Sequence, residues 1–233
     1  MSRDAFLTRV RQAAHAGRAY RVCVDQGGSG VCEDFGTLGA LGSSATDLCR
    51  RMCDEVNEVG GVAHLAEDIS AAGEQLLDLL ADYNAQTVLM WQHDVIEQLQ
   101  LKATLQKAGI EVLDHDRLIT MHPADVRSAM LTADVGVSSC DIAVAETGSL
   151  VLNAQPGQER AASLLPPVHI AVVTRQQIVA DLFDAFDQIS RYPFDDFPSN
   201  LTIITGPSKT GDIELTLTTG VHGPGQWHVI VVG

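Results

Sequence analysis

The chain has 233 residues, 45% of them hydrophobic, which is enough to build the buried core of one α/β domain. Fifteen Lys and Arg residues against thirty Asp and Glu residues give a formal net charge of −15. This balance argues against nucleic acid or an anionic membrane as the main partner, because both are bound through basic patches. A small anionic ligand remains compatible with it, since such a ligand needs only a local cluster of donors.

The first ten residues form a charged amphipathic segment unlike a signal peptide, and no stretch approaches about 18 uninterrupted apolar residues. We therefore expect a cytoplasmic protein without a membrane span. The five cysteines include no C-x-x-C pair, whereas a metal or iron–sulfur site needs more ligands at closer spacing. We expect reduced, partly buried thiols, and neither a metal nor a cofactor in this chain.

Hydrophobic periodicity predicts helices and strands that alternate along most of the chain. In chain order, the first half contains a helix at 3–16, a Gly-rich loop or irregular lobe at 18–44, a helix at 46–58, a strand at 62–65, a helix at 70–83, a strand at 87–91, a helix at 94–108, a strand at 110–113 and a helix at 123–130. The second half contains strands at 135–138, 142–145, 149–153 and 169–173, a helix at 176–190, and strands at 201–205, 213–218 and 227–232.

This alternation predicts a mainly parallel sheet covered on both faces. The strand pair within residues 142–153 and the strand-rich C-terminus add antiparallel elements. We predict an N-terminal helical and Gly-rich extension over residues 1–60 and an α/β domain over residues 61–233, which together form one compact unit.

The first candidate site segment is the turn between strands 142–145 and 149–153, where Glu146, Thr147 and Gly148 follow an apolar run. Burying an unpaired carboxylate is costly, so Glu146 needs a partner or a function. In one interpretation it caps the turn or pairs with Lys209 or an Arg. In the other it faces a cleft as nucleophile, general base or hydrogen-bond acceptor for substrate. Thr147 and Gly148 fit both interpretations, since a tight turn favours Gly and a Thr hydroxyl can donate locally.

The second candidate segment, residues 206–214, follows an apolar strand and contains few bulky side chains. Its candidate binding residues are small, hydroxylated or charged: Gly206, Ser208, Lys209, Thr210, Asp212 and Glu214. Backbone N–H groups, two hydroxyls and one ammonium can form an anion cradle, and an ordinary turn is the alternative. Asp212 and Glu214 would share one face of an extended strand, or Asp212 would cap a helix and orient Lys209.

The third candidate segment contains His222 and Gly223. Two histidines six residues apart in this region are an unspecific zinc pattern, so a hydrogen bond from His222 to the loop of Asp212 or to a ligand is the preferred interpretation. His169 opens an apolar strand and has a structural role in the simplest interpretation. Arg160 either reaches an anionic ligand or lies exposed on a helix.

Two nucleotide signatures are not met. The phosphate loop requires Gly immediately before Lys209, where Ser208 stands, and the dinucleotide fingerprint that would begin at Gly28 requires Gly at Glu33. The sequence therefore does not support ATP binding through a phosphate loop or NAD binding through a dinucleotide fingerprint.

Taken in order, the segments 145–148, 206–214 and 220–224, with residues 163–170 between the first two, resemble the LUD domain of lactate-utilisation proteins. The resemblance covers residues 60–233. It implies a three-layer α/β/α fold with a mainly parallel sheet, similar to the NagB/RpiA/CoA-transferase-like group. It also implies a role in oxidising L-lactate to pyruvate together with partner proteins that carry iron–sulfur clusters.

The chain departs from the family pattern at three positions. The family commonly has Thr where Ser149 stands, and often Arg and Ala where this chain has Lys209 and Gly211. Lys keeps the positive charge but lacks the bidentate geometry with which Arg recognises a carboxylate.

Three hypotheses follow from the motifs and the resemblance together. In the first, the chain is an accessory subunit that binds a small carboxylate or related anion at the candidate residues, including Glu146, Lys209 and His222. In the second, Glu146 acts covalently in acyl or CoA transfer, by analogy with CoA transferases. In the third, the chain is a non-catalytic assembly protein for the iron–sulfur partners.

Overall fold

The computed structural model describes residues 5, 8–9, 45–192, 197–211 and 217–233. The chain divides into two compact units, Met1–Ser43 and Ser44–Gly233. Most of the first unit, including nearly all of the helix expected at 3–16 and the whole Gly-rich stretch, lies outside the described residues. The second unit includes the helix at 46–58, which the sequence analysis places in the extension. Within the described ranges, no helix has both the length and the apolar character that crossing a membrane requires.

The second unit alternates helices and strands along its first half. In chain order these are α2 (Ala45–Glu58), β1 (Val62–Ala66), α3 (Ile69–Asp82), β2 (Thr87–Met90), α4 (Asp94–Gln98), α5 (Lys102–Lys107), β3 (Glu111–Leu113), α6 (His115–Thr120), α7 (Pro123–Leu131) and β4 (Val135–Ser138). The remaining elements are β5 (Ile142–Val144), β6 (Ser149–Asn153), η3 (Arg160–Ser163), β7 (Val168–Thr174), η4 (Arg175–Gln177), β8 (Ile178–Val179), α8 (Leu182–Ile189), β9 (Leu201–Ile204), β10 (Lys209–Gly211), β11 (Leu217–Thr219) and β12 (Gln226–Val232).

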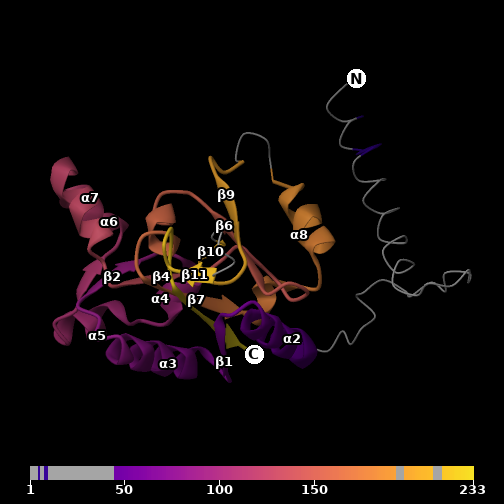
Figure 1. The fold of residues 1–233 in the computed structure, drawn as a ribbon, viewed down its shortest axis with the longest axis horizontal. Helices are drawn as coiled ribbons and strands as arrows, with labels where there is room; N and C mark the ends of the chain where they lie inside the picture. The colour runs from indigo at the N-terminus through magenta and orange to yellow at the C-terminus, as the bar shows by residue number, and fades with distance from the viewer. Residues whose placement is uncertain (1–4, 6–7, 10–44, 193–196, 212–216) are drawn as a thin grey trace, which may run out of the picture. The chain divides into compact units, whose positions relative to one another are not determined.

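The main sheet has six parallel strands in the order β1-β12-β7-β4-β2-β3, of which Figure 1 labels β1, β7, β4 and β2. Two neighbouring interior strands, β12 and β7, are almost continuous apolar runs, as expected for strands buried on both faces. The predicted mainly parallel sheet is therefore confirmed.

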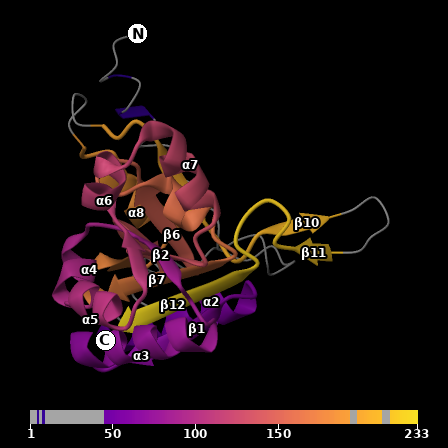
Figure 2. The ribbon, with the colours of Figure 1, turned by 90° about the vertical axis from the view of Figure 1, so that its left-hand side faces the viewer.

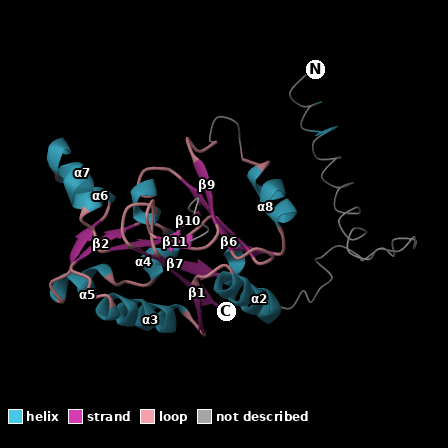
Figure 3. Cartoon of the chain, viewed as in Figure 1, coloured by secondary structure: helices cyan, strands magenta, loops and turns pink. Residues whose placement is uncertain are grey.

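Side chains alternate between two layers of core on either side of this sheet. Ile230 and Val232 point into the layer formed with α3, α4 and α5. Val229 and Val231 point into the opposite layer, which contains side chains of α2, α6 and the hairpin β5-β6. The second unit thus forms a three-layer arrangement; in Figure 3, α3 and α5 lie below the strands, and α6 and α7 lie above them.

A second sheet, in the order β8-β5-β6-β9, carries the predicted antiparallel hairpin. Its outer face packs against α8 through Ala185 and Ile189. A separate antiparallel pair, β10-β11, projects from the body of the unit (Figure 2). The strand predicted at 213–218 lies mostly outside the described residues and overlaps β11 only at its end.

Two predicted helices differ from the structure, and one helix was not predicted. The helix predicted at 94–108 is divided into α4 and α5, and Gln100 between them has a positive φ of 53°. The helix predicted at 176–190 is wrong in its first half, because β8 pairs with β5 and the helix begins only after its N-cap, Asp181. Helix α6 was not predicted, since its six residues bury only Leu118 and show no apolar period.

Candidate functional site

The turn that contains Glu146 connects β5 to β6 and is held by backbone hydrogen bonds to the last residue of β8 and the residue after it. The N–H of Glu146 donates to the carbonyl of Ala180 at 3.0 Å, and the N–H of Ala145 donates to that of Val179 at 2.9 Å. The Glu146 side chain is half-buried at this turn. Strand pairing to β8, which the sequence did not predict, therefore fixes the position of the candidate acid.

Gly148 allows this turn to lie directly against helix α2. Its φ is +61°, and a Cβ atom there would lie 2.7 Å from the backbone nitrogen of Val56 and 2.8 Å from the carbonyl carbon of Glu55. Any side chain would push the turn off the helix backbone. The glycine is thus required by close packing as well as by its backbone angle.

The second candidate segment contacts the C-terminal end of the same helix. Lys209 Nζ donates to the carbonyl oxygen of Val59 at 2.6 Å. A Cβ atom on Gly206 would lie 2.7 Å from that same oxygen. A cation at the carbonyl end of a helix is favourable, because unsatisfied carbonyl groups give that end a partial negative charge. Lys209 has this structural partner, and its side chain is otherwise exposed.

A chain of three hydroxyl groups joins the first two segments. Thr147 Oγ1 lies 2.7 Å from Ser149 Oγ, and Ser149 Oγ lies 2.7 Å from Thr205 Oγ1. Ser149 is buried, so these hydrogen bonds replace water that its hydroxyl cannot reach. Thr205 immediately precedes Gly206, and the two segments are therefore neighbours in space.

The third segment lies against the second at Ser208. The Ser208 N–H donates to the carbonyl of Pro224 at 2.9 Å, and its own carbonyl accepts from the N–H of Gly220 at 2.9 Å. A Cβ atom on Gly223 would lie 3.3 Å from Ser208 Cβ. His222 is exposed on this loop.

The three segments thus form one continuous run of contacts, from Thr147 and Gly148 through Gly206 to Ser208 and Gly223. Thr210 lies further along, in the projecting pair β10-β11. Asp212 and Glu214 lie outside the described residues. The apposition of Glu146 and Lys209 across a binding site stays a prediction.

A second group of polar residues, which the motifs did not predict, follows the carboxyl ends of β2 and β3. His115 Nδ1 lies 2.7 Å from Glu159 Oε1, and Gln92 Nε2 donates to Asp116 Oδ2 at 2.8 Å. In the main sheet β3 lies on one side of β2, and β4, the next strand along the chain, lies on the other side of β2. The direction in which strands are added therefore reverses at β2. In open α/β sheets ligands bind at the carboxyl ends of the strands near such a reversal. Polar residues directly after predicted strands were the signal that could have found this group.

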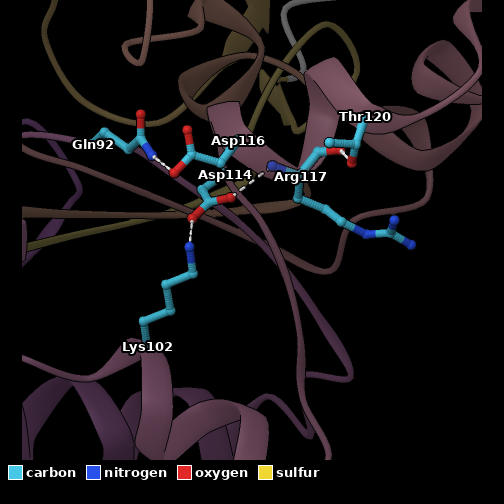
Figure 4. Close-up of polar contacts among 6 residues, drawn as sticks. All are labelled: Gln92, Lys102, Asp114, Asp116, Arg117 and Thr120. Carbon is cyan, nitrogen blue, oxygen red and sulfur yellow. Dashed lines mark hydrogen bonds and ion pairs between the residues drawn. The ribbon is translucent and has the colours of Figure 1, made fainter.

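Part of this group lies around an ion pair between a buried carboxylate and a half-exposed lysine (Figure 4). Lys102 pairs with Asp114, whose other oxygen accepts from the N–H of Arg117 at 3.0 Å and so caps helix α6. Asp114 is buried, whereas Lys102 is about half exposed. The guanidinium group of Arg117 extends away from this carboxylate in Figure 4. Next to the pair, residues of β2, α4 and α5 line a cavity of about 300 Å³.

Two titratable groups near this edge are shifted by burial. Burial lowers the pKa of His93, although the charges of Asp141, Asp94 and Glu97 oppose the shift. Burial raises the pKa of Asp141, opposed by hydrogen bonds from Asn153. The N–H of Asn153 donates to Asp141 Oδ2 at 2.9 Å. This edge of the sheet therefore holds partly desolvated charges, which is the kind of environment found at functional sites.

His169 has a structural environment in the middle of the main sheet. Its Nε2 lies 2.8 Å from the Ser138 hydroxyl, and burial lowers its pKa to about 3. It is therefore neutral at physiological pH. Its Nδ1 is buried and has no hydrogen-bond partner among the described residues.

The thiols of the described residues are free. Cys49 and Cys140 are buried, and burial raises the pKa of Cys53 to about 11. In the part of the chain that the structure describes, no three His, Cys, Asp or Glu side chains are arranged to hold a metal ion.

Comparisons with known proteins agree with the family resemblance. The family model described as LUD domain matches residues 49–232. A protein of Halalkalibacterium halodurans named lactate utilization protein C is 33% identical over 165 residues, which is 68% of each chain. A protein of the same name from Anoxybacillus flavithermus is 27% identical over 230 residues and covers 98% of each chain.

A solved structure shares the fold. The crystal structure of a DUF162 family protein from Deinococcus radiodurans superimposes with a TM-score of 0.56, covering 82% of this chain and 99% of that one at 22% identity. The family model spans most of the second unit. It includes the three candidate segments, whose contacts we call the three-segment contact, and the polar residues after the carboxyl ends of β2 and β3. The chain belongs to the LUD domain family.

Proposed function

We propose that this chain is a subunit of an L-lactate utilisation system that oxidises lactate to pyruvate together with iron–sulfur partner proteins. The observation that carries the proposal is its 33% identity, over 68% of both chains, to a protein named lactate utilization protein C. The match of the LUD domain model to residues 49–232 supports it.

Oxidation of lactate to pyruvate removes two electrons and two protons, so the system needs an electron acceptor. The described thiols of this chain are poor candidates, because burial raises the pKa of Cys49, Cys53 and Cys140 and keeps them protonated. Iron–sulfur clusters of partner proteins supply the acceptor in this proposal. The strongly acidic composition favours partners that present basic surfaces.

The subunit also binds a small anionic metabolite at the three-segment contact. Lys209 is exposed and its ammonium group can exchange the Val59 carbonyl for a ligand carboxylate, because a charged hydrogen bond is stronger than a neutral one. Ser208 and His222 lie on adjacent loops and supply further donors. Glu146 lies at the turn that packs against α2 through Gly148, and it is the acid of this site in the proposal.

A genetic experiment tests the role in lactate oxidation. Deletion of the gene should abolish growth of the source organism on L-lactate as sole carbon source, and its return should restore growth. The chain should also co-purify with cluster-containing proteins from cells grown on L-lactate. Normal growth of the deletion strain on L-lactate rejects the proposal.

A binding experiment tests the anion site separately. Calorimetry with pyruvate and L-lactate should show binding that Lys209→Ala weakens about tenfold and Lys209→Arg preserves, because only the charge is essential. Lys107→Ala, which removes a lysine at the end of α5, is the matched control and should change nothing. Equal affinities for wild type and Lys209→Ala remove Lys209 from the site.

A further inference from the structure

A pocket of about 860 Å³ opens beside the second sheet. Its described lining combines charged, aromatic and apolar residues, among them Asp141, Glu159, Arg160, Ala161, Tyr192 and Phe197. This volume lies within the range that small-molecule sites occupy. The charges and rings of the lining indicate which kind of small molecule fits it.

Asp141 has a partly desolvated carboxylate and forms no ion pair with any described residue. Its side chain is half-buried, and burial raises its pKa, because the ionised form loses contact with water. The N–H of Asn153 donates to Asp141 Oδ2 at 2.9 Å. Hydrogen bonds from Asn153 oppose the rise in pKa without cancelling it, so a cation would stabilise this carboxylate further.

His93 does not supply this cation. The charges of His93 and Asp141 are close enough to influence each other. Burial lowers the pKa of His93, however, so its imidazole is neutral at physiological pH. Its Nδ1 accepts from the N–H of Val95 at 3.2 Å, which holds that nitrogen without a proton. A cation from outside the chain would therefore complete the surroundings of Asp141.

The remaining charges of the lining also favour a cationic ligand. Glu159 adds a second carboxylate, whose Oε1 lies 2.7 Å from His115 Nδ1. The basic side chain of the described lining, Arg160, is exposed to solvent. Solvent screens an exposed charge more strongly than a partly buried one. Two carboxylates against one exposed guanidinium group thus make the pocket attractive to a cation and unattractive to a carboxylate.

The aromatic residues of the lining fit the body of an organic cation. The rings of Tyr192 and Phe197 meet edge to face, with centroids 6.2 Å apart. Phe197 is 50% exposed, so a ligand that covers it removes apolar surface from water. A cation over an aromatic face gains further electrostatic attraction. A bare metal ion would not cover this apolar surface, and among the described residues no three His, Cys, Asp or Glu side chains are placed to hold one.

We propose that this pocket binds an organic ammonium ion, a primary amine with an apolar body of several carbon atoms. The ammonium group pairs with Asp141, and Glu159 adds to the attraction. The apolar body lies against Tyr192 and Phe197. The ligand has the opposite charge to the anion proposed at Lys209, and this site does not depend on the proposed role in lactate oxidation.

Calorimetric titration of the purified full chain with four probes tests the proposal. Hexylamine carries both features, hexanol lacks the charge, hexanoate has the opposite charge, and ammonium chloride lacks the apolar body. Hexylamine should bind at least about tenfold more tightly than hexanol or ammonium chloride, and hexanoate should not displace it. Absence of hexylamine binding to folded protein, equal binding of hexanol or ammonium chloride, or displacement by hexanoate overturns the proposal.

Variants locate the binding. Asp141→Asn keeps an acceptor for the N–H of Asn153 but removes the charge, and it should weaken hexylamine binding at least about tenfold. Asp82→Asn is the matched control and should leave the affinity unchanged, because Asp82 is an exposed residue of α3, which packs on the opposite face of the main sheet.

Two further variants test the aromatic wall and the sign of the ligand charge. Phe197→Ala, at a half-exposed position that folding tolerates, should weaken hexylamine binding about threefold or more. Arg160→Gln should not weaken it, because a guanidinium group repels an ammonium ion. Undiminished binding in Asp141→Asn or in Phe197→Ala rejects this pocket. Weaker binding in Arg160→Gln contradicts a cationic ligand.

Discussion

The hydroxyl of Ser149 lies 2.7 Å from the hydroxyl of Thr205, a residue 56 positions later in the chain. This contact joins the turn of Glu146 to the strand end that precedes Gly206. Because Ser149 is buried and also contacts Thr147, it connects two of the three segments that carry the family motifs.

Removal of this contact should be measurable as a coupling energy. Ser149→Ala should lower the free energy of unfolding by about 1–3 kcal/mol, because it removes two hydrogen bonds from a buried site. Thr205→Val should cost about 1 kcal/mol or less, since Thr205 is exposed. A double-mutant cycle in urea should give a coupling of about 0.5–1.5 kcal/mol. Thr202 is the control, because its hydroxyl donates to Asn200 and not to Ser149. A cycle that combines Ser149→Ala with Thr202→Val should give almost no coupling energy.

Alanine substitutions at Gly148 and Gly109 should distinguish the cost of a steric clash from the cost of backbone strain. Both have positive φ, but a Cβ atom on Gly148 would meet the backbone of α2, whereas nothing lies within 4 Å of one on Gly109. Gly109→Ala should therefore cost about 1–2 kcal/mol from its backbone angle alone. Gly148→Ala should cost at least about 3 kcal/mol, because helix backbone cannot give way locally. Equal losses in urea unfolding would show that the turn does not pack on α2 as described.

The ion pair of Lys102 and Asp114 should matter far more than the exposed pair beside it. Lys102→Met leaves a buried carboxylate without its cation and should cost about 1–3 kcal/mol, less than for a fully buried pair because Lys102 is half exposed. Arg117→Ala removes an exposed partner of Glu111, 3.4 Å away, and should cost under about 0.5 kcal/mol. Thermal and urea unfolding of the two variants check this order, and a reversed order would contradict the burial of Asp114.

Stability should fall on acidification through His228. Burial, with the neighbouring His64, lowers the pKa of His228 to about 4, and its ring bonds His64 at 3.1 Å and Tyr83 at 2.8 Å. Between this value and the ordinary value of about 6.5, the unfolded chain binds a proton that the folded chain does not. The contribution is therefore complete above about pH 6.5 and is lost as the pH falls toward 4.

The size of this effect is measurable against a variant that cannot titrate there. The difference in unfolding free energy between wild type and His228→Gln should shrink by up to about 3 kcal/mol from pH 7 to pH 4. Urea unfolding at several pH values gives this difference directly. If the difference in unfolding free energy does not change with pH, folding does not lower the pKa of His228.

Much of the fold followed from local patterns. Continuous apolar runs predicted the interior parallel strands β7 and β12, and the turn at Gly148 predicted the hairpin β5-β6. The half-helix that was wrongly predicted before Asp181 shows the limit of this approach. Ile178 and Val179 are extended because β5 offers them a partner, and pairing between distant segments is not encoded in local periodicity.

The sequence by itself determined the family motifs, the parallel sheet and the small residues that permit close contact at Gly148 and Gly206. Only the tertiary structure decided that Lys209 meets the end of helix α2, and that Asp141 and Glu159 line one pocket with Arg160. The physical reason is that burial and hydrogen-bond satisfaction depend on which distant segments approach one another. Apolar periodicity reports which face of an element is inside, but not which polar atom is left there without a partner.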